Sequence, residues 1–304
     1  MSTCATLSRI QAEPLAGTAP TAAAWLLVEQ SGPWGAKALT QSRLDPGLGR
    51  SLEAAAKGTG VRVALIRRPG RHAEQNPGGR RRIIVAHTGP GNAWVRTTTL
   101  TDPRELTRLD LGRLGAGDHG GLWEPYRDDP LALVCTNGRR DRCCALRGRP
   151  LAQELTAGGW GCWEITHIGG HRFSPTLLTL PHGYVYGRVT GVLAKGVLAA
   201  LQDGRMVRDH CRGRTAWEGP GQAAELAVRA LTGEDSADAL TVPGRENGPG
   251  DGREGRRVTV THRDGRRWLV TVDRETSGPP LPASCGAEPE PQPRMAVRGI
   301  APLP

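Results

Sequence analysis

The chain has 304 residues, which is enough for two domains or for one large one. Its formal net charge is +10, yet the basic residues are scattered and do not alternate with aromatic ones. A solvated basic surface therefore explains the charge better than a nucleic-acid interface. No apolar stretch approaches the length of a membrane span, and we find no signal peptide, so we expect a cytoplasmic protein with neither specific nucleic acid nor membrane as a partner.

The cysteine content indicates how the thiols are used. There are seven cysteines, an odd number, and their spacing is uneven. In a chain without a signal peptide, this pattern favours reduced thiols and metal ligation over a disulfide framework. Only 38% of the residues are hydrophobic, and there are 42 Gly and 24 Pro, so we expect compact cores separated by flexible connections.

Residues 1–125 are predicted to form a smaller N-terminal α/β domain that begins with a polar lead over 1–22. Short apolar or β-branched runs predict its strands, at 25–29, 61–66, 83–86 and 94–100. Helical composition predicts a helix over 48–57, which Gly58 ends. A second helix over 103–113 is predicted because Asp102 is a good N-cap and Pro103 suits the first helical position.

Residues 126–238 are predicted to form a second α/β domain. Its expected elements are a strand at 131–135, a helix at 150–156, a strand at 160–166, a hairpin of 177–180 with 184–186, and helices over 189–201 and 220–231. Strand, helix, strand, hairpin and helix is the order of a thioredoxin-like fold. The first domain has a similar order, although no residue-level repeat is visible.

The C-terminal part is predicted to be less regular. Residues 239–256 are largely a low-complexity mixture of Gly, Glu and Arg, which indicates a disordered linker. Within 257–304, a β-hairpin of 258–261 with 268–272 is expected around Asp264-Gly265, followed by a Pro-rich irregular tail.

Two cysteines and two histidines in the second domain form the candidate site. Cys135 ends an apolar strand, and Cys144 is predicted to lie in the loop before the next helix. Arginines between the two cysteines favour the thiolate, which is the form that binds metals. His167 and His171 follow the next strand. Two glycines between them argue against a helix and for a tight loop, so the helical metalloprotease pattern does not apply.

The residues alone leave the chemistry of this site open. Two Cys and two His fit tetrahedral zinc, and they also fit a [2Fe–2S] cluster. Structural zinc sites usually contain closely spaced cysteine pairs, and in Rieske centres each loop supplies one Cys and one His. The eight residues between Cys135 and Cys144 match neither pattern. The residues alone therefore favour iron–sulfur only slightly over zinc. A thioredoxin-like thiol oxidoreductase is a third alternative, but the chain has no Cys-x-x-Cys motif.

Three stretches of the second domain resemble the sucrase/ferredoxin-like family, a group of thioredoxin-like ferredoxins with bacterial members and fungal relatives. They are CTNGRRDRCCA from Cys135, WEITHIGGHRF from Trp163 and LTLPHGYVYGR from Leu178. The resemblance implies a thioredoxin-like ferredoxin domain, preceded by the smaller α/β domain and followed by the hairpin and tail.

The same resemblance implies a [2Fe–2S] cluster held by Cys135, Cys144, His167 and His171. In the doublet Cys143-Cys144, the family's spacer of eight selects Cys144 and makes Cys143 a neighbour. An electron carrier is thus expected, with a redox partner protein such as an acidic ferredoxin or a reductase. Sucrase activity finds no support, because a glycoside hydrolase needs two carboxylates across a sugar site and no acidic pair stands out near these motifs.

Overall fold

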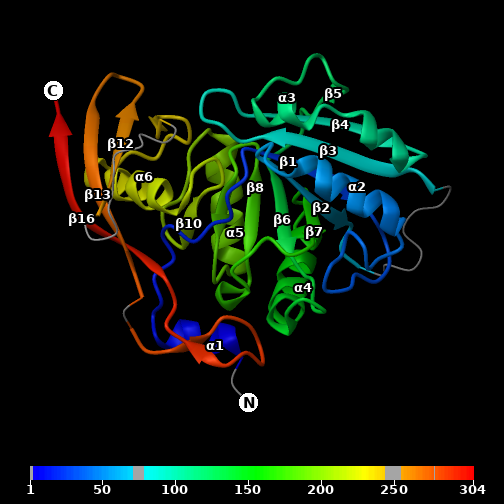
Figure 1. The fold of residues 1–304 in the computed structure, drawn as a ribbon, viewed down its shortest axis with the longest axis horizontal. Helices are drawn as coiled ribbons and strands as arrows, with labels where there is room; N and C mark the ends of the chain where they lie inside the picture. Colours follow the sequence, from blue (N-terminus) through cyan, green and yellow to red (C-terminus); the bar gives the residue numbers. More distant parts are fainter. Residues whose placement is uncertain (1–2, 71–78, 244–254, 277) are drawn as a thin grey trace.

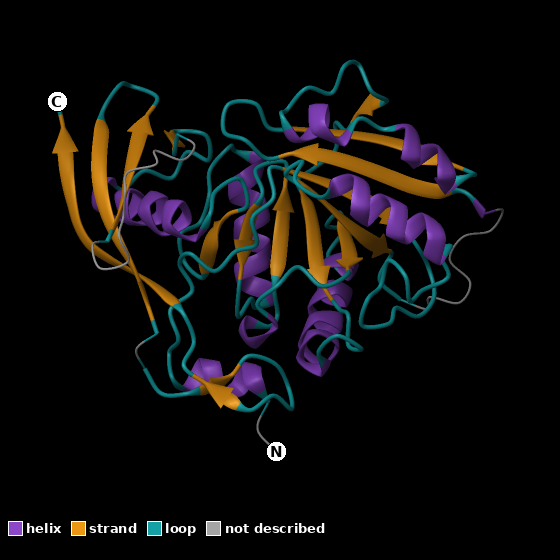
Figure 2. Ribbon diagram, in the orientation of Figure 1, coloured by secondary structure: helices purple, strands orange, loops and turns teal. Residues whose placement is uncertain are grey.

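A ten-stranded mixed β-sheet with helices packed against it forms most of the molecule (Figures 1 and 2). The computed structural model describes residues 3–70, 79–243, 255–276 and 278–304. In chain order, the strands of the large sheet are β1 (Ala24–Glu29), β2 (Val61–Arg67), β3 (Arg81–His87), β4 (Trp94–Leu100), β5 (Glu124–Pro125), β6 (Leu131–Cys135), β7 (Cys162–Ile165), β8 (Leu177–Leu180), β9 (Tyr184–Tyr186) and β10 (Cys211–Arg214). Their order across the sheet is β10-β9-β8-β6-β7-β2-β1-β3-β4-β5.

The two halves of this sheet have the same connectivity. In the first half, α2 (Pro46–Ala56) connects the parallel strands β1 and β2; in the second, α4 (Arg142–Ala157) connects the parallel strands β6 and β7. In each half two antiparallel strands follow, β3 and β4 or β8 and β9. The expected α/β class is therefore confirmed. The halves join where β2 pairs antiparallel with β7, so one sheet runs across the predicted boundary at residue 125, and the division into domains stays a prediction.

Hydrophobic side chains form a core on each face of the sheet. One face carries a core shared by both halves, which includes Trp25 and Leu27 of β1 and Leu133 and Cys135 of β6. The other face is divided into two cores. Helix α2, the 3₁₀ helix η2 (Pro103–Arg108) and α3 (Leu111–Gly115) contribute to the first; α4 and α5 (Gly191–Gln202) contribute to the second. The single helix predicted over 103–113 is thus split into η2 and α3.

A separate four-stranded sheet lies at the C-terminal end. Its order is β11 (Leu240–Thr241), β12 (Arg256–His262), β13 (Arg267–Glu275) and β16 (Arg294–Leu303), and α6 (Gly219–Thr232) packs against it (Figure 1). The predicted hairpin is present as β12 and β13. The expectation of an irregular tail is wrong for β16, which pairs with β13 along its length. Most of the predicted linker, residues 244–254, lies outside the described residues.

The N-terminal segment lies at the lower edge of the molecule in Figure 1, beside a segment that precedes the last strand, β16, whose C-terminal end is at the upper left. The predicted polar lead contains a helix, α1 (Cys4–Ile10), whose N-cap is Thr3. This helix packs against the 3₁₀ helix η3 (His171–Phe173) and against β14 (Leu281–Pro282), which pairs with β15 (Pro289–Glu290). Among the described residues, no helix is both long and apolar enough to cross a membrane.

Candidate metal centre

Two buried thiols lie where α4 packs over the end of β6. Cys135 is the last residue of β6, and Cys144 lies in the first turn of α4. The prediction that Cys144 precedes the helix is wrong: α4 begins at Arg142 because Asp141 caps it, accepting a hydrogen bond of 2.8 Å from the Cys143 amide. Pro150, which was expected to start the helix, lies inside it.

A glycine lets α4 approach Cys135 closely. A Cβ atom at Gly148 would lie 2.2 Å from the Cys135 carbonyl oxygen, a backbone atom that has no freedom to move aside. Only glycine therefore permits this packing distance. This close contact determines the distance between α4 and β6, and so brings the thiols of Cys135 and Cys144 together.

The two histidines lie on a loop that two arginines hold in place. His167 follows β7, and His171 begins η3. Arg62 donates a hydrogen bond of 3.1 Å to the His167 carbonyl, and the buried Arg212 donates one of 3.0 Å to the Gly169 carbonyl. Gly170 has a φ of +68°, and a Cβ atom there would lie 2.2 Å from Arg212 Nη2. The tight loop expected from the two glycines is thus built around a buried guanidinium.

The neighbouring glycines offer a matched test of this loop. Gly169 and Gly170 both have positive φ, so alanine at either position costs roughly 1–2 kcal/mol in backbone strain. Only Gly170 is also crowded by Arg212, whereas a Cβ atom at Gly169 meets nothing within 4 Å. We expect Gly170→Ala to lower the free energy of unfolding by about 1–3 kcal/mol more than Gly169→Ala, measured by urea denaturation. Equal losses would show that Arg212 does not constrain the loop.

The structure brings all four predicted site residues into one neighbourhood. Ligand atoms of Cys135, Cys144 and His167 all lie within 4.8 Å of one another. His171 is outside this compact group, but its ring centroid is 4.9 Å from that of His167. The side chain of His171 is 13% exposed, whereas both cysteines are buried. The histidine side of the group is therefore the side nearer to solvent.

The surroundings of Cys135 and His171 favour the protonation states that metals require. Hydrogen bonding from Cys144, assisted by His167, holds the pKa of Cys135 well below its usual value despite burial. Its partner Cys144 has a raised pKa, because a thiol that donates to a thiolate keeps its proton. Burial, together with the adjacent His167 ring, lowers the pKa of His171 and so favours the neutral imidazole.

Three ring nitrogens in this group are buried without a hydrogen-bond partner among the described residues. They are Nδ1 of His167 and both nitrogens of His171. The nearest acidic atom is Oδ2 of Asp141, 3.8 Å from His171 Nε2. A buried polar atom without a partner costs about 1–3 kcal/mol. A metal ion bound to one nitrogen of each imidazole would remove that cost for up to two of the three nitrogens. The donor set and its unpaired nitrogens therefore fit a metal centre.

The two members of the cysteine doublet face different groups. Successive residues of a helix point about 100° apart, so Cys143 and Cys144 cannot turn to the same side. Cys144 lies with Cys135 and His167, whereas Cys143 lies with Cys4, Asp141 and Cys285. Contact with Cys4 lowers the pKa of Cys143 to about 5.

The sequence interpretation missed the residues that support the site from outside the motif. Asp141 caps α4 and lies close to His171, and its place just before a helical segment was a recognisable N-cap signal. Arg62 and Arg212 lie 105 and 43 residues from the loop carbonyls that they bind, and nothing local in the sequence marks them.

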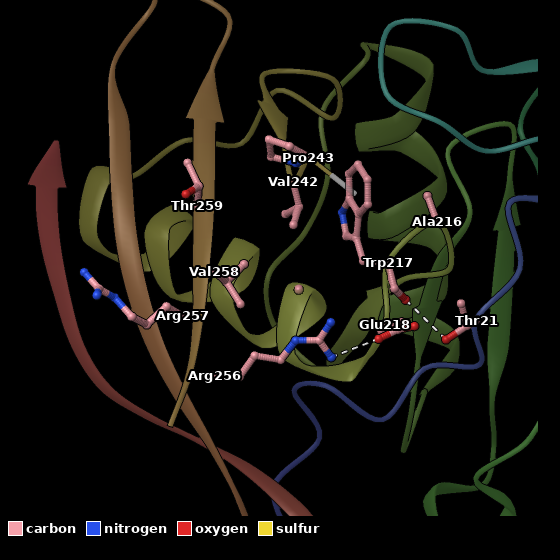
Figure 3. A pocket seen from close by; sticks show the side chains of 11 residues that line it. Thr21, Ala216, Trp217, Glu218, Val242, Pro243, Arg256, Arg257, Val258 and Thr259 are labelled. Atoms are coloured by element: carbon pink, nitrogen blue, oxygen red, sulfur yellow. Dashed lines mark hydrogen bonds and ion pairs between the residues drawn. The ribbon is translucent and has the colours of Figure 1, made fainter. Parts of the chain in front are cut away.

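A pocket elsewhere in the molecule has none of this chemistry. It lies between α6 and the C-terminal sheet, and Trp217, Glu218, Val242 and Val258 are among the residues that line it (Figure 3). An ion pair of 3.0 Å between Arg256 and Glu218 lies at one side. Since its lining holds neither Cys nor His, the pocket is separate from the candidate metal centre.

Fold and site together define an α/β protein with a buried Cys/His group suited to a metal. A family model described as sucrase/ferredoxin-like matches residues 15–213, and the chain therefore belongs to this family. No curated protein and no solved structure matches the chain.

Proposed function

We propose that the protein is an electron carrier in which Cys135, Cys144, His167 and His171 hold a [2Fe–2S] cluster. The observation that carries this proposal is the convergence of two thiols and two imidazoles, with three ring nitrogens buried and unpaired. Membership of a family described as sucrase/ferredoxin-like supports it. We also propose that the second half of the sheet is thioredoxin-like, since β6-α4-β7 followed by the antiparallel β8 and β9 has the order expected of that fold.

A cluster with this ligation, when bound, supplies reversible one-electron transfer. Two neutral imidazoles in place of two thiolates leave the site less negative than an all-cysteine site, which favours reduction. The guanidiniums of Arg62 and Arg212 interact with the Cys135 thiolate and favour reduction further. Burial lowers the pKa of Arg212 to about 9, so it stays a cation at neutral pH.

An exposed cationic patch next to the site suits an acidic redox partner, such as a ferredoxin or a reductase. The patch consists of four exposed arginines just before and along α4, Arg139, Arg140, Arg142 and Arg149, and Leu146 of the same helix is 63% exposed. Arg172, which lies beside His171, is not part of this patch, because it is paired with Glu13 at 2.6 Å. Complementary charge at such a surface mainly increases the rate of association.

Reversing charge in the patch should slow electron transfer from an acidic donor. We expect Arg139→Glu/Arg140→Glu to lower the second-order rate of reduction by a reduced acidic ferredoxin about ten-fold or more at low salt, with a smaller difference at high salt. Stopped-flow absorption measures this rate. Arg263→Glu, an exposed arginine in the turn between β12 and β13, is the matched control and should have little effect. Equal slowing by both variants would remove the patch from the docking surface.

A zinc module is the second candidate function, and one observation favours it. The ligand atoms of Cys135, Cys144 and His167 are compact enough to surround a single ion. A thiol oxidoreductase is less well supported, since Cys135 and Cys144 are fully buried and exchange requires access to a sulfur.

Anaerobic purification followed by iron, sulfide and zinc analysis tests the proposal. We expect about two iron and two sulfide ions per chain and a coloured protein. A colourless protein that contains zinc but no sulfide, and that loses this zinc in Cys144→Ser, would support the zinc module instead. Zinc has a filled d shell and gives no visible bands, so the two functions are separated by absorption alone.

A further inference from the structure

Three thiols from distant parts of the chain meet beside the candidate metal centre. The Sγ atoms are 3.5 Å apart for Cys4 and Cys143, 3.6 Å for Cys4 and Cys285, and 3.1 Å for Cys143 and Cys285. All three are free cysteines. They come from the start of α1, the first turn of α4 and the segment after β14, and Figure 1 shows the first and last of these segments side by side.

These distances suit one metal ion. Zinc–sulfur bonds of about 2.3 Å in a tetrahedron place the sulfur atoms about 3.8 Å apart, close to the spacing of this trio. In a [4Fe–4S] cluster each ligand binds a different iron, so the ligand atoms lie much further apart than they do here. A disulfide is the third possible use of the trio. It would join only two of the three cysteines and would give no role to the third thiol or to a neighbouring carboxylate.

That carboxylate is Asp141, whose side chain is buried. Its two oxygens lie 3.9 and 3.8 Å from Cys4 Sγ. Oδ1 accepts a hydrogen bond from the Cys143 amide at 2.8 Å, and Oδ2 accepts one from the Cys285 amide at 2.7 Å. The carboxylate is thus fixed in orientation by the backbones of two of the three cysteines. Each oxygen keeps a second lone pair that can bind a metal.

We propose that Cys4, Cys143 and Cys285 bind one zinc ion as thiolates, with the carboxylate of Asp141 as the fourth ligand. Three thiolates and one carboxylate satisfy the preference of zinc for four ligands, and zinc carries out no redox chemistry of its own. Binding releases the protons that the thiols still hold. This site is separate from the proposed iron–sulfur centre, and two of its ligands lie outside residues 15–213, the part of the chain that matches the family model.

The position of the site indicates what zinc would do. Cys4 begins the N-terminal helix α1, Cys285 lies between β14 and β15, and α1 packs on η3, which begins with His171. One ion would fasten both segments to the start of α4, next to the histidine loop. The zinc is therefore structural: it holds α1 and the segment after β14 in place over the histidine side of the proposed iron–sulfur centre.

Metal analysis of single variants of the full chain tests this assignment. We expect wild-type protein to contain about one zinc ion per chain that Cys4→Ser and Cys285→Ser both lose. Cys162→Ala, which changes a buried cysteine in β7 away from the trio, should keep it. Unchanged zinc in Cys4→Ser and Cys285→Ser, or a disulfide between any two of the trio in alkylated wild-type protein, would overturn the proposal.

A cobalt measurement keeps this result independent of the iron–sulfur centre. In Cys144→Ser, which removes a ligand of that centre alone, Co²⁺ added to metal-free protein should give the intense near-ultraviolet thiolate-to-cobalt absorption of a tetrahedral site. The double variant Cys144→Ser/Cys285→Ser should lose about a third or more of this absorption, since one of three thiolates is gone. Identical spectra for the two variants would exclude the trio as a metal site, whatever Cys135 and the histidines bind.

Discussion

Cys144→Ser is expected to remove the visible absorption of the purified protein, while Cys143→Ser keeps it. The two residues are adjacent in the sequence, but Cys144 lies within 4.8 Å of the ligand atoms of Cys135 and His167, whereas Cys143 faces Cys4 and Cys285. A serine hydroxyl is a poor substitute for a thiolate on iron, so loss of the true ligand should reduce the visible absorbance and the bound iron by about ten-fold. Absorption spectra and iron analysis of anaerobically prepared protein measure both quantities.

The opposite result would reassign the ligand. If Cys143→Ser bleached the protein and Cys144→Ser did not, iron would lie with the cysteine trio and the compact group at Cys135 would need another role. Far-ultraviolet circular dichroism provides the control, because both substitutions lie in the first turn of α4 and must leave the helix intact. Loss of colour in both variants, with the fold intact, would mean that the two groups form a single metal centre.

Most strands could be predicted from the sequence, because the apolar runs and turn residues that mark them lie within the segments themselves. Each of the two halves has a nearly continuous apolar strand, 24–29 or 131–135, because it is buried on both faces of the sheet. Hairpins such as 177–180 with 184–186 were marked by turn residues between apolar runs. The start of α4 was misplaced because Pro150 resembled a first helical residue, while the true N-cap, Asp141, lay among arginines in a segment interpreted as a metal-binding loop.

The four residues of the candidate centre could be predicted for a similar reason, since the motif places them within 37 consecutive residues. The cysteine trio could not. Cys4 and Cys143 are 139 positions apart, and Cys4 and Cys285 are 281 apart, so only tertiary structure brings them together. Each looked incidental in its own segment, because α1 and β14 are short and their positions depend on packing rather than on local sequence preference.

The strand β16 also could not be predicted from its local sequence. It contains Gly299 and Pro302, which reduce strand propensity, and its burial pattern lacks the clear alternation of β12. It forms because β13 presents an edge to which it can pair, with a bulge near Thr271 that accommodates the irregular register. The pairing partner, and not the sequence of the segment, determines that it is a strand.

A buried ion pair lies where the two halves of the large sheet meet, and its disruption should have a large effect on stability. Arg67 of β2 and Glu164 of β7 face each other across the only strand pairing that joins the halves within the described part of the chain. The guanidinium contacts Glu164 Oε2 at 2.8 Å through Nε and at 2.7 Å through Nη2, and the two side chains are 4% and 2% exposed. Arg67 also lies 3.9 Å from the Trp34 ring and donates to the Gly32 carbonyl.

We expect Glu164→Ala to lower the free energy of unfolding by about 3–5 kcal/mol, because it leaves the guanidinium of Arg67 buried without its counter-charge. Burial already lowers the pKa of Arg67, and Glu164 is the neighbour that opposes this shift. The double variant Arg67→Met/Glu164→Leu has no unpaired charge and should recover about 1–4 kcal/mol relative to Glu164→Ala. Urea denaturation of metal-free protein measures both values without a contribution from bound metal.

A hydrogen bond connects this ion pair to the strand that carries Cys135. Thr136, the residue after Cys135, donates a hydrogen bond of 2.7 Å to Glu164 Oε2, so the ion pair is connected to the end of β6. Glu164→Ala removes this acceptor, and Thr136→Val removes the donor while keeping the ion pair. We expect Thr136→Val to cost only about 1–2 kcal/mol, because the charged pair is retained. If Glu164→Ala cost no more than Thr136→Val, the ion pair would not be what holds the two halves together, and the shared core around Trp25 and Leu133 would be sufficient on its own.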